Sequence, residues 1–252
     1  MSPAIRLFTA FALALTLSAC ATPASGPVHY VKLEQCTSAP ATVVNIAVPN
    51  QKPISLSREV CLRVRSVLDR IEPQSGVRVD EVLLTNQRSV NAGATRGKNG
   101  STLVLIHAGM MQALGTDDDA WAGLLGHEVA HLALRHSENR QSNESAASSA
   151  GRVVSEVLGQ LIPGVGGLAA SIVGGTVTEM VTRGAFTRPQ EVDADRKGLQ
   201  WMVAAGYDPH GMLRLMEILG RQGSVPEFLS THPGAENRQQ MVQEFIDKQK
   251  KP

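Results

Sequence analysis

The sequence predicts an α+β fold that is mostly helical, with a small antiparallel sheet beside one buried helix. Three observations support this class. Several segments repeat apolar residues every three to four positions, as helices with one buried face do. Segments 77–85 and 101–107 alternate or run apolar like strands, and the Gly-rich and Asn-rich loop between them favours an antiparallel hairpin. Residues 121–134 form a nearly continuous apolar helix interrupted by two histidines and a glutamate.

The remaining helices follow from the same periodicity. Residues 57–71 place six apolar side chains on one face, with Ser57 as N-cap and Pro73 and Gly76 after the end. The helix at 121–134 begins behind three consecutive aspartates, which suit the positive end of a helix dipole. Further helical segments are expected at 110–114, 189–205 and 209–221.

Residues 1–19 have the pattern of a targeting segment. Arg6 precedes an apolar run that is too short to span a bilayer, and Leu17-Ser18-Ala19-Cys20 matches the bacterial lipobox. We therefore expect cleavage before Cys20, lipid on that residue, and attachment to the membrane through this lipid. Similarity to other bacterial lipoproteins, in which the residue after the cysteine governs sorting, implies the outer membrane for Ala21 rather than Asp, with the chain facing the periplasm. An ordinary signal peptide and an uncleaved anchor are the alternatives.

Composition divides the rest of the chain into a tether and one domain. Segment 20–53 holds five prolines among small and polar residues, so we expect a lipidated N-terminus and tether without a core. Residues 54–252 are expected to form a single domain. Without Arg6, 23 basic residues balance 23 acidic ones, which gives no indication of a nucleic-acid partner. Cys36 and Cys61 form either a disulfide or two free thiols, and an oxidising compartment favours the disulfide.

The pattern His127-Glu128-Val129-Ala130-His131 predicts a zinc site. On a helix, a spacing of four residues places both imidazoles on one face, and the carboxylate between them in the sequence would serve as general base. A catalytic zinc needs three protein ligands, so one is missing. Glu191 is the candidate, and Asp195, one turn further along the same helical face, would accept the free N–H of a ligating histidine. We expect one zinc ion per chain.

Residues 55–245 resemble the gluzincin metallopeptidases that include HtpX-like membrane proteases, the CAAX prenyl endopeptidase and small periplasmic lipoprotein proteases. The resemblance is carried by Val90-Asn91-Ala92, the strand 102–106, Gly109-Met110-Met111, HEVAHLALRHSE at 127–138, EVDADRKGL at 191–199, AAGYDP at 204–209, Leu229-Ser230-Thr231-His232-Pro233 and Arg238. It implies a zincin-like fold, His127, His131 and Glu191 as zinc ligands, and Glu128 as base.

The chain departs from the family pattern at three places. No long transmembrane pair follows the metal helix, and no tetratricopeptide array follows Arg238, so it resembles the minimal, single-domain type. Residues 93–97 read Gly-Ala-Thr-Arg-Gly where the family more often has an aromatic residue and a proline. This difference leaves the course of the substrate-facing edge strand open.

The expected activity is zinc-dependent hydrolysis of peptide bonds in unfolded or misassembled envelope proteins. A substrate strand would lie along the sheet edge near Asn91 and Ala92. His232 and Arg238, expected together on a tight turn, would stabilise the oxyanion. For His232, a fourth zinc ligand in a latent state and a helix cap are alternatives. The competing functions are a non-proteolytic, zinc-containing chaperone or assembly factor, and a hydrolase of non-peptide amides.

Residues 145–187 carry the least specific pattern. Segment 157–178 has no charged residue, yet it contains Pro163 and six glycines, which are poor formers of a continuous helix. We expect two short helices joined at Pro163, packed beside the cleft or on a lipid surface. A membrane span and a lid or interaction segment are the alternatives.

Overall fold

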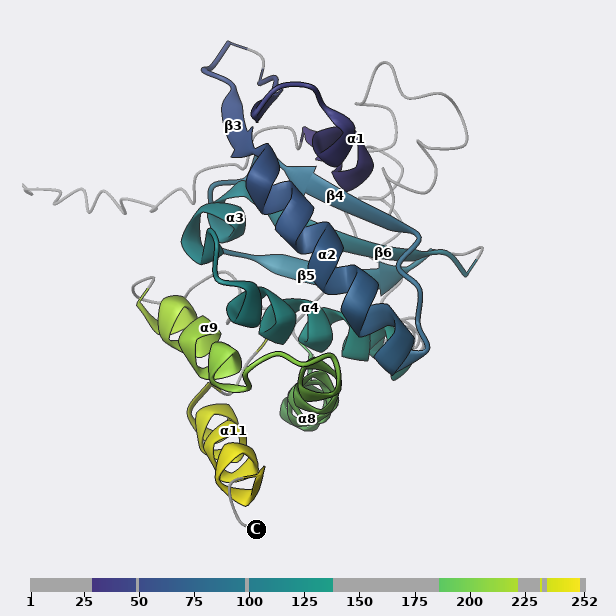
Figure 1. The fold of residues 1–252 in the computed structure, drawn as a ribbon, viewed down its shortest axis with the longest axis vertical. Helices are drawn as coiled ribbons and strands as arrows, with labels where there is room; N and C mark the ends of the chain where they lie inside the picture. Colours follow the sequence, from purple (N-terminus) through teal and green to yellow (C-terminus); the bar gives the residue numbers. More distant parts are fainter. Residues whose placement is uncertain are drawn as a thin grey trace, which may run out of the picture.

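A four-stranded sheet with helices against one face forms the centre of the fold (Figure 1). The computed structural model describes residues 29–48, 50–97, 100–137, 186–221, 232 and 235–249. The sheet has the order β1-β4-β6-β5, with β1 at Tyr30–Lys32, β4 at Glu81–Thr85, β5 at Ala92–Arg96 and β6 at Thr102–His107. A separate antiparallel pair is formed by β2 at Val43–Ile46 and β3 at Ile54–Ser57.

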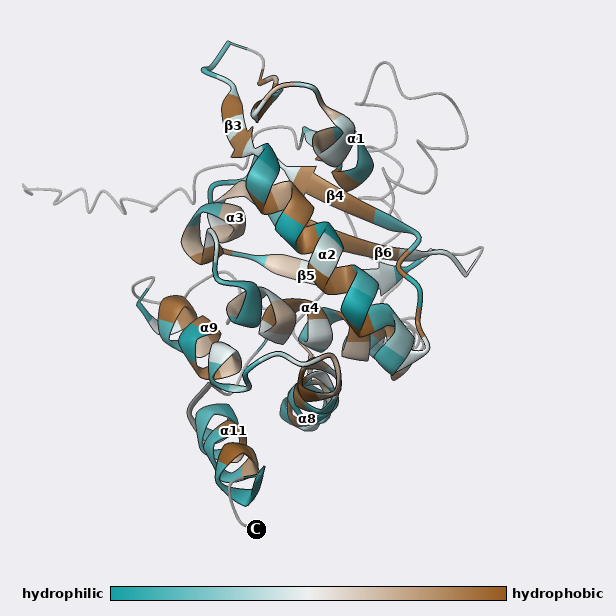
Figure 2. Ribbon diagram, in the orientation of Figure 1, coloured by the Kyte–Doolittle hydropathy of each residue, from teal (hydrophilic) through white to brown (hydrophobic). Residues whose placement is uncertain are grey.

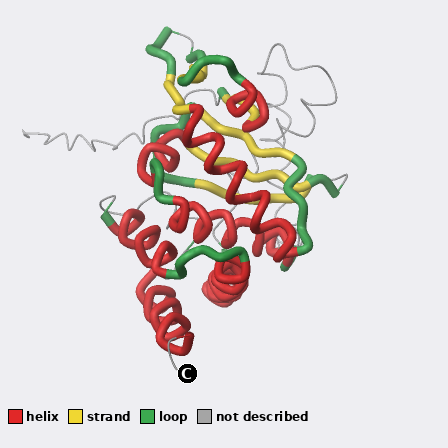
Figure 3. Tube along the Cα trace, in the orientation of Figure 1, coloured by secondary structure: helices red, strands yellow, loops and turns green. Residues whose placement is uncertain are grey.

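Helices make up most of the described chain, as Figure 3 shows. Their bounds are Leu33–Ser38 for α1, Arg58–Ser75 for α2, Ala108–Leu114 for α3, Asp118–Ala133 for α4, Arg188–Ala204 for α8, His210–Gly220 for α9 and Ala235–Gln249 for α11. The mostly helical α+β class predicted from the sequence is therefore confirmed. The helices expected near 57–71, 110–114, 121–134, 189–205 and 209–221 are α2, α3, α4, α8 and α9.

The predicted antiparallel hairpin of 77–85 with 101–107 is wrong. β4 and β6 are parallel, with Glu81 opposite Leu103 and Thr85 opposite His107. The connection between them contains β5, so the chain reverses direction twice before β6 begins. The actual hairpin joins β5 to β6, and its turn is closed by a hydrogen bond of 2.8 Å from Gly97 N to Ser101 O. The sheet is therefore mixed, with β1 and β5 at its two edges.

Alternation along β4 and β6 directs one set of side chains into the main core. Val82 and Leu84 on β4, like Val104 and Ile106 on β6, are buried together with the apolar face of α2. In Figure 2 both strands are largely brown, whereas α2 carries polar as well as apolar residues. The main core thus lies between the sheet and the helices that cover this face.

The folded unit begins earlier than the sequence predicted. We expected no core before residue 54, but β1 pairs with β4, and Leu33, Cys36 and Ile46 are all buried. The sulfur atoms of Cys36 and Cys61 form a disulfide that joins α1 to α2. Short strands and a two-turn helix give a weak periodic signal among prolines, which explains the misplaced boundary.

The central helix α4 is enclosed by other elements. Every residue from Ala120 to Leu132 is buried. Helix α8 crosses α4 where Gly198 of α8 lies against Gly126 of α4. A Cβ atom on Gly198 would lie 2.8 Å from the backbone nitrogen of His127, so only glycine allows this approach. The close crossing places the N-terminal half of α8 opposite the histidines of α4.

Several expectations fall on residues outside the described ranges. They are the signal segment, the lipidation of Cys20, and the arrangement of 145–185. Among the helices that the structure describes, none combines the length and apolar character needed to cross a bilayer.

Candidate metal centre

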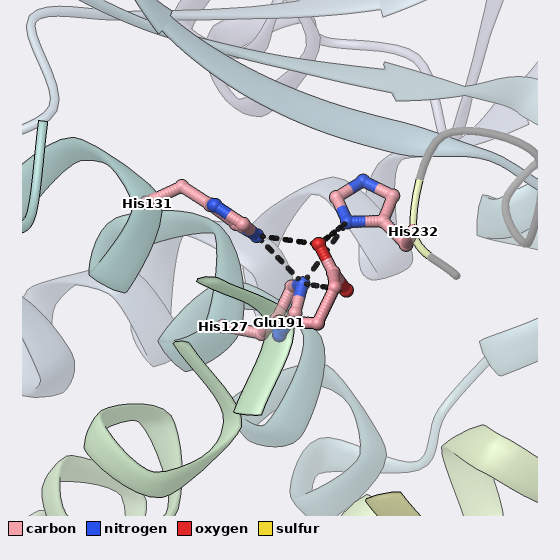
Figure 4. A group of neighbouring side chains, drawn as sticks. All are labelled: His127, His131, Glu191 and His232. Atoms are coloured by element: carbon pink, nitrogen blue, oxygen red, sulfur yellow. Dashed lines mark hydrogen bonds and ion pairs between the residues drawn. The ribbon is translucent and has the colours of Figure 1, made fainter. Parts of the chain in front are cut away.

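Four side chains from three parts of the chain meet at one point. His127 and His131 come from α4 and Glu191 from α8, and His232 completes the group (Figure 4). One ligand atom from each residue lies within 4.8 Å of all the others, and all four residues are buried. The helical spacing predicted from HExxH therefore brings both imidazoles to the same point as the predicted glutamate.

The separations between these atoms suit a tetrahedral zinc ion. Two ligands bound at ordinary zinc distances lie about 3.3 Å apart in a tetrahedral site. Nε2 of His131 lies 3.0 Å from Nε2 of His127 and 3.4 Å from Oε1 of Glu191. Nδ1 of His232 lies 3.2 Å from Nε2 of His127 and 3.0 Å from Oε1 of Glu191.

The buried charges also suit a divalent cation. Glu128, Glu191 and Asp195 are fully buried, and the guanidinium of Arg238 is the cation that contacts two of them. With neutral histidines, these three carboxylates and this guanidinium leave a net charge of two negative units among the described residues of the site. Burying such charge is costly unless a cation is present. The nitrogen and oxygen donor set, its spacing and its charge therefore fit zinc.

His127 is oriented through its second ring nitrogen. Nδ1 lies 2.8 Å from Oδ1 of Asp195, whose carboxylate accepts two hydrogen bonds from Arg238, at 2.5 Å and 2.8 Å. Burial opposes ionisation of Asp195, but the charge of Arg238 and the hydrogen bonds from Arg238 and His127 together outweigh it and lower the pKa of this carboxyl group. An ionised Asp195 accepts a hydrogen bond from the Nδ1–H group of His127. The proton therefore stays on Nδ1, and the lone pair of Nε2 is free to bind a metal. The contact between His127 and Asp195 has the geometry that the predicted role of Asp195 requires, and the role itself stays a prediction.

Glu128 has the surroundings of a proton acceptor. Both carboxylate oxygens are buried, and neither has a hydrogen-bond partner within the described part of the chain. Burial raises the pKa of Glu128 above its ordinary value. A carboxylate held without hydrogen bonds in a low-dielectric site takes up a proton more readily than an exposed one.

The side chain of His131 contacts His136 and Phe186, neither of which was predicted as a site residue from the sequence. Nδ1 of His136 lies 3.0 Å from Nδ1 of His131, and burial lowers the pKa of both imidazoles. The ring of Phe186 stacks on His131 with centroids 3.9 Å apart and planes inclined by 22°. Phe186 directly precedes Thr187, the N-cap of α8, and an apolar residue at this position was the available signal.

Arg238 and His232 do not share a tight turn, contrary to the prediction. Arg238 lies on α11, a helix that is not among those predicted from the sequence. Its guanidinium contacts Asp195 and Glu191 and donates at 3.3 Å to the backbone oxygen of His232. These contacts orient other groups of the site, whereas the proposed interaction with an oxyanion stays a prediction. Nε2 of His232 lies 3.8 Å from Oε1 of Glu128.

Asn91 and Ala92 lie where β5 begins. The backbone oxygen of Asn91 accepts a hydrogen bond of 3.0 Å from His107 N, and its side-chain oxygen accepts one of 2.9 Å from Ala92 N. β5 is an edge strand of the described sheet and packs against α4. Of the two predicted substrate-binding residues, Ala92 is thus the first residue of an edge strand that packs against α4, and Asn91 directly precedes it.

Comparison with known proteins agrees with this geometry. Over 166 residues, 64% of the chain, it is 30% identical to mitochondrial metalloendopeptidase OMA1 of Arabidopsis thaliana, covering 30% of that protein. It is 29% identical over 163 residues to the beta-barrel assembly-enhancing protease of Escherichia coli strain K12, covering 62% of this chain and 32% of that one. A Protease HtpX homolog of Bacillus licheniformis is 30% identical over 189 residues, covering 64% and 62%.

The chain spans about a third of the length of the first two relatives. The model of peptidase family M48 matches residues 61–246, a range that contains His127, Glu128, His131, Glu191, His232 and Arg238. Since this match covers well over half of the sequence, the chain belongs to peptidase family M48.

Proposed function

We propose that the protein is a zinc-dependent endopeptidase of the bacterial cell envelope that hydrolyses unfolded or misassembled proteins. The observation that carries the proposal is the buried donor group of His127, His131 and Glu191, with the buried carboxylate of Glu128 beside it, to which no described residue donates a hydrogen bond. Membership of a family of metallopeptidases supports the same chemistry.

Each residue has a separable task in this reaction. A zinc ion held by His127, His131 and Glu191 would polarise the peptide carbonyl and acidify the attacking water. Glu128 accepts the proton of that water. Asp195 and Arg238 keep the Nδ1 proton of His127 in place, so that Nε2 faces the metal. The edge of β5 near Asn91 and Ala92 offers backbone groups to an extended substrate, which requires little side-chain recognition. Such binding suits unfolded polypeptides.

The proposed location rests on the lipobox at Cys20 and on the relatives named for envelope functions. A lipid anchor on the periplasmic face of the outer membrane would present the active site to envelope proteins. Labelled fatty acid entering the wild-type protein but not Cys20→Ala tests this anchoring. Absence of label from the wild-type protein would refute it.

The proteolytic proposal is tested by Glu128→Gln in the full-length protein. We expect the variant to keep about one zinc per chain, because Glu128 is not among the proposed ligands, and to lose most cleavage of casein. His131→Ala is the matched variant that should lose both zinc and cleavage. Unchanged casein cleavage by Glu128→Gln would remove this residue from the mechanism.

A second function is favoured by the position of His232. Its Nδ1 atom lies within the donor group, so it would close the zinc site as a fourth protein ligand. Structural zinc sites are closed in this way. A chain closed permanently would act as a zinc-containing chaperone or assembly factor without proteolysis. Wild-type protein that binds zinc, prevents aggregation of an unfolded envelope protein and cleaves no substrate would support this alternative.

A further inference from the structure

We propose that His136 is a positioning residue for His131, holding the imidazole so that Nε2 faces the metal donors. This proposal rests on the assignment of His131 as a zinc ligand in the proposed function. The two Nδ1 atoms are 3.0 Å apart, within hydrogen-bond distance. His131 is fully buried and His136 is 6% exposed, so both rings are held by the protein rather than by bulk water.

The backbone after α4 is shaped to make this contact. On a continuous helix, residues five positions apart point in directions about 140° apart, so His136 would face away from His131. The helix instead ends at Ala133, and Arg135 adopts a left-handed conformation with φ 54°. Residues other than glycine, asparagine and aspartate seldom adopt this conformation. The reversal at Arg135 turns His136 back against the ring of His131.

The positions of the protons follow from the geometry. A neutral imidazole carries one N–H, and Nε2 of His131 lies in the donor group, where it needs a free lone pair. The proton of His131 is therefore on Nδ1, and this N–H group donates a hydrogen bond to Nδ1 of His136. Since Nδ1 of His136 is the acceptor, His136 carries its own proton on Nε2.

The two ligating histidines of α4 are thus oriented by different acceptors. His127 donates to the carboxylate of Asp195, whereas His131 donates to an imidazole. Phe186 covers one face of the His131 ring and leaves that ring little freedom to turn. Partners of this kind raise metal affinity because they fix the tautomer and the direction of the ligand.

The test measures zinc affinity of the full-length protein by competition with a chelator, independently of activity. His136→Leu removes the acceptor and should weaken zinc binding by roughly 10–100-fold, the usual effect of losing such a partner. His136→Asn should keep most of the affinity, because its amide oxygen can replace Nδ1 as acceptor. His210→Leu, at an exposed histidine paired with Asp208, is the matched control and should bind zinc like the wild type.

A folded His136→Leu with wild-type zinc affinity would overturn the proposal, and so would His136→Asn binding as weakly as His136→Leu. If His136→Leu does not fold, nitrogen-15 NMR of the zinc-loaded wild type tests the hydrogen bond and the tautomer of His131 instead. We expect a coupling across the hydrogen bond between the two Nδ1 atoms, and a proton on Nε2 of His131 would overturn the assignment. Zinc binding without any proteolysis by the wild type would contradict the proposed function and leave this inference standing.

Discussion

His232 is the residue whose neighbours give it two opposite roles. Nδ1 lies among the metal donors, while Nε2 points toward the carboxylate of Glu128. As a fourth ligand, His232 would occupy the coordination position that an attacking water needs, and the protease would be latent. As an oxyanion donor, it would have to leave the donor group before catalysis. The distances around Nδ1 support the ligand role, which was an alternative to the oxyanion role preferred from the sequence.

We therefore expect His232→Ala to raise the rate of casein cleavage, because the variant frees a coordination position while His127, His131 and Glu191 remain. Initial rates at matched zinc content, compared with His210→Ala as control, measure the effect. If kcat falls about a hundredfold with zinc and folding retained, His232 acts on the transition state instead.

The element that fixes the site is α4, and its N-terminus is held by Asp117. The Asp117 carboxylate accepts from Ala120 N at 3.0 Å and from Arg214 on α9 at 2.7 Å and 2.8 Å. The hydrogen bond from Arg214 lowers the pKa of Asp117 below its usual range. One carboxylate thus caps the metal helix and joins it to α9.

Asp117→Ala should lower the free energy of unfolding by about 1–2 kcal/mol near neutral pH, mainly through loss of the cap. Arg214 is 41% exposed, so the ion pair itself adds little. Because the folded-state pKa is lowered, this stabilisation is present above the unfolded-state pKa of Asp117 and is lost as pH falls through the folded-state pKa. Urea unfolding at neutral and acidic pH measures the difference. Asp69→Ala, at an exposed aspartate of α2, is the control, and an equal loss there would contradict the role of Asp117.

Helices were more predictable than strand pairing, for a physical reason. The helices α2 and α4 have long apolar patterns with clear start signals, and both were placed within a few residues of their observed bounds. By contrast, β5 contains Ala92, Gly93 and Ala94, which are weak strand formers. An unrecognised strand in the connection reversed the predicted direction of β6 relative to β4. Similarly, a local pattern could not show that Arg135 turns His136 back onto α4.

At the scale of the whole molecule, the site is assembled from segments far apart in the chain. Spacing along a helix was enough to group His127 with His131, and to place Glu191 and Asp195 on one face. Their approach depends on the crossing of α4 and α8 at Gly126 and Gly198, which no sequence period reveals. Arg238 reaches Asp195 from α11, 43 residues away. Such contacts depend on tertiary packing, so the spacing of residues in the sequence does not predict which side chains meet.

The disulfide between Cys36 and Cys61, which are 25 residues apart, joins α1 near the N-terminus of the described chain to α2. Closing a loop of this length restricts the unfolded chain and contributes roughly 3 kcal/mol in the chain-entropy description. Neither cysteine belongs to the donor group, so loss of the disulfide should lower stability without removing zinc.

Cys36→Ala combined with Cys61→Ala should therefore unfold at lower urea concentration than the wild type, with similar zinc content below the transition. Adding a reductant should bring the wild type to the stability of the double variant and leave the variant unchanged. Measured free thiols must show that reduction took place. Wild-type protein with two free thiols and undiminished stability would contradict this role, because the loop would then be held by packing alone. An oxidising compartment such as the periplasm would preserve the bridge in the cell, in keeping with the proposed location.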